Sequence, residues 1–190
     1  MPQARRLRHG RRGFRVWLML GYVIHDERGD ASVRMAALAA ALSVEGWRLA
    51  GAVQVDLDHG ADCACEMTLE VLGAGVAPIR ISQSLGLGSS GCRLDSGALE
   101  QAAGLADRIL AERVLEGSAD LVIVNKFGKQ EAAGRGFRAL IGAALAQGVP
   151  VLTAVPPEYL AAFEGFAGDY ALRLDWDAAM EWCRAQRVAA

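Results

Sequence analysis

Apolar runs alternate with polar, glycine-rich segments along the chain, and this alternation predicts a succession of strands and helices. Branched apolar residues dominate two runs, Asp120–Asn125 with its central LVIV and Val149–Val155. Runs of this kind are typical of strands buried on both faces, as in a parallel sheet. Phe14–Ile24 and Arg48–Val55 have the same character, and a last short strand is predicted at Leu172–Leu174.

Helical spacing of apolar residues separates these strands. Ser32 is expected to cap a helix that runs to Leu42, and Asp95 or Ser96 a long helix that ends near Leu115. Further helices are predicted over Phe137–Gln147, Pro156–Phe163 and Trp176–Arg187.

Glu66–Leu72 and Pro78–Gln83 alternate between apolar and polar residues and are separated by Gly73 and Gly75, which predicts a hairpin. The pattern as a whole predicts an α/β protein whose mainly parallel central sheet carries helices on both faces and one inserted hairpin. In such a sheet, ligands are expected in the loops at the carboxyl ends of the strands.

The composition limits the class of protein. The 190 residues are 53% hydrophobic, so residues 16–190 can form one domain with a sizeable core. No apolar run approaches the roughly 18–20 residues that cross a bilayer, which argues against a membrane span. Four scattered cysteines and no recognisable secretory signal predict a cytoplasmic protein with reduced thiols.

Positive charge is concentrated at the start of the chain. Residues 1–15 contain six arginines and no acid, and the remaining residues carry a formal charge of −8. An acidic body argues against a general nucleic-acid binder. A disordered N-terminal arm over residues 1–15 is the simplest interpretation, and a contact with anionic lipid, nucleic acid or an acidic partner is the alternative.

The loop after the predicted hairpin has the chemistry of an anion site. Its serine hydroxyls, its glycines and the arginine that follows can donate hydrogen bonds to a tetrahedral oxyanion, although such residues also form ordinary flexible loops. The candidate ligand-binding residues here are Ser82, Gln83, Ser84, Gly88, Ser89, Ser90, Gly91 and Arg93.

A second candidate loop, Lys126–Gly136, follows the most apolar strand. Lys126 and Lys129 are the only lysines in a chain with eighteen arginines. Together with Asn125 and Arg135 they are candidate ligand-binding residues. Glu131 is expected either to position a water or to pair with Arg135, four residues further on.

Two further motifs bear on the chemistry of the chain. His59, Cys63 and Cys65 form H-x3-C-x-C, which with Cys92 could hold a thiophilic metal, although free loop cysteines are the simpler interpretation. The turn GYVIHDERGDAS lacks the lysine and the glycine spacing of a phosphate-binding loop, which favours a solvated acidic turn.

The segments RISQSLGLGSSGCRLDSGAL, DLVIVNKFGKQEAAGRGFR and GVPVLTAV closely resemble a bacterial family of unknown function, DUF2478, whose genes are often found beside molybdate-transport genes. That family is in turn similar to the THEP1-type nucleoside triphosphatases, which implies a P-loop-NTPase-like fold. In those enzymes a strand ends in an acidic pair followed by glycine, lysine and glutamate. Gly128, Lys129 and Glu131 match that pattern, whereas Asn125 and Lys126 replace the acidic pair.

The resemblance and the departures together predict an oxyanion- or nucleotide-phosphate-binding protein of molybdenum metabolism without efficient hydrolysis. Molybdate, or ATP or GTP with Mg²⁺, are the expected ligands, and molybdenum-transport or molybdoenzyme-assembly proteins the expected partners. One alternative is a divergent Mg²⁺-dependent nucleoside triphosphatase in which Glu131 positions water and Lys129 stabilises the γ-phosphate. The other is a metal carrier that uses His59, Cys63, Cys65 and Cys92.

Overall fold

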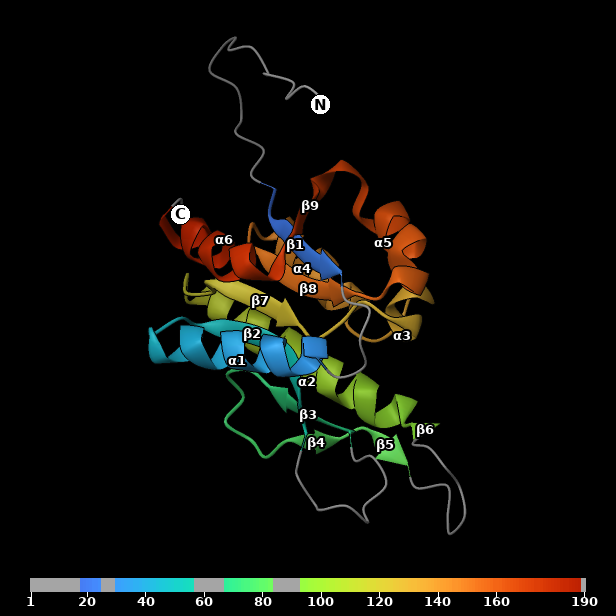
Figure 1. The fold of residues 1–190 in the computed structure, drawn as a ribbon. Helices are drawn as coiled ribbons and strands as arrows, with labels where there is room; N and C mark the ends of the chain where they lie inside the picture. The colour runs from blue at the N-terminus through green and yellow to red at the C-terminus, as the bar shows by residue number, and fades with distance from the viewer. Residues whose placement is uncertain (1–17, 25–29, 57–66, 84–92, 189–190) are drawn as a thin grey trace, which may run out of the picture.

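The computed structural model describes residues 18–24, 30–56, 67–83 and 93–188, and within them the central feature is a seven-stranded sheet. Its strand order is β4–β3–β2–β7–β8–β1–β9 (Figure 1). The strands are β1 (Leu20–Ile24), β2 (Leu49–Asp56), β3 (Met67–Val71), β4 (Ile79–Arg80), β7 (Leu121–Val124), β8 (Val151–Val155) and β9 (Ala171–Leu174). The helices are α1 (Asp30–Val44), α2 (Ser96–Leu115), α3 (Lys129–Ala132), α4 (Arg138–Ala146), α5 (Leu160–Ala167) and α6 (Trp176–Val188), with the 3₁₀ turns η1 (Pro157–Tyr159) and η2 (Gly168–Tyr170).

The parallel part of the sheet is the centre of the molecule. Within the run β2–β7–β8–β1–β9, adjacent strands pair in parallel, and every residue of β7 and β8 is buried. Alternate residues of β7 belong to two cores, Leu121 and Ile123 to one and Val122 and Val124 to the other. α1 and α6 cover the first face, and α2, α4 and α5 cover the second, as Figure 1 shows. The predicted α/β architecture is therefore confirmed.

The predicted hairpin extends the sheet at one edge. β3 pairs antiparallel with β2, and β4 pairs antiparallel with β3. The prediction of one strand over Pro78–Gln83 is wrong, because the chain changes partners at Ile81. The N–H of Ile81 donates to Met67 O, whereas its carbonyl accepts from Asp95 N. Beyond it, β5 (Ser82–Gln83) pairs with β6 (Arg93–Leu94) in a separate two-stranded sheet.

The helix starts show one correct prediction and one wrong one. Asp95 is the N-cap of α2, where its side chain accepts from Ala98 N at 3.0 Å and this hydrogen bond holds the pKa of Asp95 below its usual value. Ser32 does not cap α1. That helix begins at Asp30, which pairs with Arg34 one turn later, and Ser32 is buried within its first turn.

The other predicted helices and strands are found within a few residues of their expected bounds, apart from residues 14–17, which lie outside the described residues. A single helical turn, α3, forms inside the predicted loop Lys126–Gly136. The helices of the described segments include none that is both long and apolar enough to cross a membrane. The predicted arm over residues 1–15 lies outside the described residues.

Candidate functional site

A cavity of about 290 Å³ lies at the carboxyl edge of the sheet. β2, β7 and β8 run in parallel, so Gln54 near the end of β2, Asn125 after β7 and Pro156 after β8 meet at this edge. Ile81 and Leu94, which bracket the segment between β5 and β6, line the same cavity. The strand topology therefore brings the ends of the first predicted loop and the start of the second to one place.

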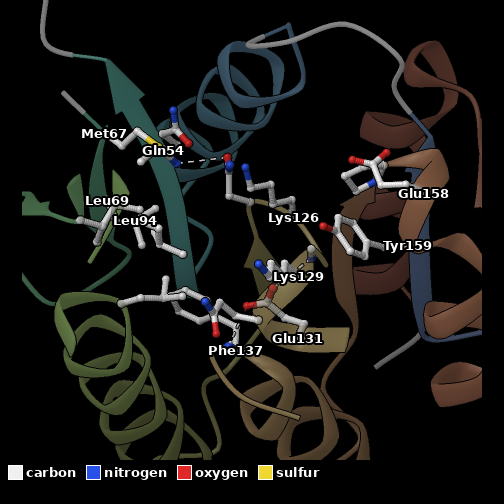
Figure 2. A pocket seen from close by; sticks show the side chains of 16 residues that line it. Gln54, Met67, Leu69, Leu94, Lys126, Lys129, Glu131, Phe137, Glu158 and Tyr159 are labelled. Carbon is white, nitrogen blue, oxygen red and sulfur yellow. Dashed lines mark hydrogen bonds between the residues drawn. The ribbon is translucent and has the colours of Figure 1, made fainter. Parts of the chain in front are cut away.

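Lys126 and Lys129 supply the positive charge of this cavity. Both side chains are exposed, and both line it. Figure 2 shows them on the segment after β7, facing Met67, Leu69 and Leu94 across the open space. Glu158 of η1, also exposed, adds one negative charge to the lining.

Asn125 is held by its neighbours rather than presented to solvent. Its carboxamide is buried, its Oδ1 accepts from Gln54 N at 3.1 Å, and its Nδ2 donates to Ser32 Oγ at 3.1 Å. In P-loop NTPases the helix-start serine or threonine and a strand-end aspartate hold Mg²⁺. Here Ser32, in the first turn of α1, and Asn125, which follows β7, hydrogen-bond to each other, and the strand-end group is an amide beside Lys126. Ser32 and Asn125 thus do not fit a magnesium site.

Glu131 is likewise engaged with the backbone. The residue is 4% exposed, and its carboxylate accepts from Gly128 N at 2.9 Å and from Phe137 N at 3.1 Å. The predicted pairing with Arg135 is wrong, since among the described residues no ion pair joins these two side chains. Arg138 instead donates to the backbone carbonyl of Glu131 at 3.2 Å. Both carboxylate oxygens therefore stabilise the turn that carries Lys126 and Lys129.

The remaining predicted anion-binding residues fall into two groups. Ser82, Gln83 and Arg135 are described but do not line the cavity; Ser82 Oγ accepts from Met67 N at 3.1 Å. Arg93 is placed by its backbone in β6, opposite Gln83. The others lie outside the described residues: Ser84, Gly88, Ser89, Ser90 and Gly91.

The predicted metal ligands His59, Cys63, Cys65 and Cys92 also lie outside the described residues. Within the described part of the chain, no cluster of three or more His, Cys, Asp or Glu side chains is arranged to hold a metal ion. Cys183 is fully buried on α6, and this burial raises the pKa of its thiol to about 12. It is therefore a core residue.

Sequence reasoning missed the apolar half of the cavity. Met67 and Leu69 of β3, Leu99 of α2 and Phe137 line it, and each was expected only as part of a strand or a helix. Gln130 lines it as well. Its Nε2 donates to Ser96 Oγ at 3.4 Å, and its buried Oε1 has no hydrogen-bond partner in the described structure.

Comparison with known proteins gives three similarities. A family model described as "Protein of unknown function (DUF2478)" matches residues 20–182. The Molybdenum import ATP-binding protein ModC 2 of Bradyrhizobium diazoefficiens is 39% identical over 147 residues, which are 77% of this chain and 16% of that protein. The chain therefore corresponds to about a sixth of the length of this curated relative.

The third similarity is to a solved structure, the solution structure of a human cancer-related nucleoside triphosphatase. The two folds superpose with a TM-score of 0.56 at 13% sequence identity, over 88% of this chain and 95% of that one. This likeness, together with the parallel sheet between two helical layers, establishes a P-loop-NTPase-like fold.

Proposed function

Because the chain belongs to the DUF2478 family, whose description states no activity, we propose a function from its own cavity: binding of an oxyanion or of the phosphate group of a larger ligand. The observation that carries the proposal is the placement of Lys126 and Lys129. The only two lysines of the chain line one cavity at the carboxyl edge of the sheet. Ligands of open α/β sheets bind at this edge.

The chemistry of the lining supports an anion. An ammonium group is a strong hydrogen-bond donor to phosphate-like oxygens. The buried Glu131 carboxylate does not oppose such a ligand directly, because both of its oxygens accept backbone N–H groups. The predicted serine- and glycine-rich loop begins and ends beside this cavity, and we propose Ser84, Gly88, Ser89, Ser90, Gly91 and Arg93 as further donors to the same anion.

We propose that hydrolysis is inefficient. Phosphoryl transfer by P-loop enzymes depends on a metal ion that neutralises developing charge. The Ser32–Asn125 pair does not fit that ion, and the Glu131 carboxylate is committed to the turn after β7. The two lysines therefore supply cations for binding, whereas Asn125 and Glu131, which follow β7, offer no carboxylate free to hold a metal.

A role in molybdenum handling rests on the curated relative, whose name is that of an ATP-binding protein for molybdenum import. Molybdate is a tetrahedral dianion that lysine, amide and hydroxyl donors can hold without a metal ligand. We propose that this cytoplasmic chain works with proteins of molybdenum transport or molybdoenzyme assembly.

The test is a double substitution of the two lysines. Each charge-assisted hydrogen bond is worth about 1.5–3 kcal/mol, so Lys126→Ala with Lys129→Ala should weaken anion binding by about a hundredfold or more. Calorimetric titration of the wild-type protein and the double variant with molybdate, inorganic phosphate, ATP and GTP, each with and without Mg²⁺, measures this.

Arg173→Ala is the matched control, because Arg173 is an exposed cation outside the cavity. It lies on β9, the last strand in the sheet order, whereas the cavity lies at the ends of β2, β7 and β8. This variant should bind as the wild type does. Equal affinity of the lysine variant and the wild type would overturn the proposal. Magnesium-dependent phosphate release from ATP or GTP would replace it with the nucleoside triphosphatase alternative.

A further inference from the structure

One half of the cavity is unsuited to an inorganic ion. Six apolar side chains of the lining form what we call the apolar wall: Met67, Leu69, Ile81, Leu94, Leu99 and Phe137. Figure 2 shows Met67, Leu69 and Leu94 across from the two lysines. A hydrated oxyanion such as molybdate or phosphate gains nothing from apolar surface. Burial of apolar ligand surface, in contrast, is favourable in proportion to its area. The wall therefore suits a ligand that joins an anionic group to an apolar body.

The size of the cavity limits that body. A volume of about 290 Å³ is at the lower end of the roughly 300–1,000 Å³ that small-molecule sites occupy. Such a space suits one ring system with one phosphate better than a dinucleotide or a long chain. A bare tetrahedral ion, with five heavy atoms, would leave most of it empty.

One polar group of the cavity lining indicates what kind of ring fits. Gln130 presents a buried Oε1 that has no partner among the described residues. A buried acceptor without a partner is costly, and a ligand N–H would satisfy it. A nitrogen-containing planar ring against the apolar wall can supply that N–H.

We infer that the cavity takes a heteroaromatic monophosphate, with its ring against the apolar wall and its phosphate at Lys126 and Lys129. This inference rests on the proposed anion-binding function and names its ligand class. The apolar wall lies on the face of the sheet that α2 covers, whereas α1 packs on the opposite face of the sheet. Contact between the ring and this wall thus does not involve the first turn of α1.

The experiment compares phosphate ligands with and without a heteroaromatic ring. Calorimetric titration of the full chain without Mg²⁺ would use inorganic phosphate, ribose 5-phosphate, AMP, GMP and CMP. At least one nucleoside monophosphate should bind about tenfold or more tightly than ribose 5-phosphate, a difference of about 1.4 kcal/mol. Equal binding of ribose 5-phosphate and all three nucleotides would overturn the inference and leave anion binding intact.

Two variants separate the two parts of the site. Met67→Gln replaces a half-buried apolar side chain of the wall by a polar one of similar shape, and it should reduce the nucleotide affinity while ribose 5-phosphate binding stays unchanged. Glu70→Gln, on the same strand but exposed and outside the cavity, is the control and should change neither. Equal nucleotide binding by Met67→Gln and the wild type would overturn the placement of the ring.

Adenosine, guanosine and cytidine complete the test. If these nucleosides bind as tightly as their monophosphates, the lysines do not recognise the phosphate, and the proposed anion-binding function fails. If none of the phosphorylated probes binds, the inference fails. Molybdate binding would then preserve the anion-binding function, and its absence would overturn that function too.

Discussion

The carboxylate of Glu131 is buried beside the backbone of the turn that follows β7. Its two oxygens accept from Gly128 N and Phe137 N, and Gly136 N between them donates to Glu100 at 2.7 Å. The glutamate thus ties the start of α3 to the start of α4. Its role in the described structure is to position the segment that carries Lys126 and Lys129.

We expect Glu131→Gln to destabilise the protein by about 1–3 kcal/mol, because the carboxamide retains only one acceptor oxygen for two buried N–H groups. Urea unfolding measures the change. Glu158→Gln is the control, since Glu158 lines the same cavity but is exposed, and its free energy of unfolding should stay within about 0.5 kcal/mol of wild type. A fully stable Glu131→Gln variant that had lost an activity would instead favour a catalytic role.

At the scale of elements, β2 depends on a glycine where it lies beside β7. Gly51 has a φ of 105° and pairs with Ile123. A Cβ at this position would overlap the backbone carbonyl of Ile123, which cannot move without disrupting the centre of the sheet. The close approach of the two strands therefore requires the absence of a side chain.

Gly51→Ala should cost about 3 kcal/mol or more, since it combines a strained backbone conformation with steric overlap. Gly104→Ala is the matched substitution. Gly104 lies within α2, where a Cβ would meet open space, and the change should stabilise the protein by about 0.5–1 kcal/mol. Thermal unfolding of both variants tests the pair, and similar melting temperatures for the two would contradict this account of β2.

At the scale of the whole molecule, the sheet was predictable from the sequence and the site only in part. Runs such as LVIV identify buried strands by composition alone, so the parallel centre followed directly. The spacing of Asn125, Lys126 and Glu131 placed them at a strand end but carried no information on where their side chains point. All three residues line the cavity, but Asn125 and Glu131 bond to partners within the chain, whereas the Lys126 side chain is exposed.

The apolar wall shows a different limit of prediction. Met67 and Leu94 are far apart in sequence but line the same cavity. Met67 lies on β3 of the main sheet and Leu94 on β6 of the smaller sheet, so the cavity depends on how the two sheets are placed. That arrangement depends on the change of strand partners at Ile81, which no local sequence pattern predicts. A cavity that several elements line depends on how those elements pack. Packing is harder to predict from a single sequence than the elements themselves.

The hydrogen bond between Asn125 and Ser32 has a consequence for motion. Asn125 lines the cavity on one side of the sheet, and its amide reaches the first turn of α1, which packs on the other side. A ligand that immobilises the end of β7 should also reduce the local opening of α1. We expect hydrogen–deuterium exchange at residues 33–36 to slow when the cavity is occupied.

The same ligand should leave this exchange unchanged in Ser32→Ala, where the connection to Asn125 is cut. Slowing of equal size in the variant and the wild type would contradict the coupling. In the wild-type protein, occupancy on one face of the sheet would thus be detectable as protection on the opposite face.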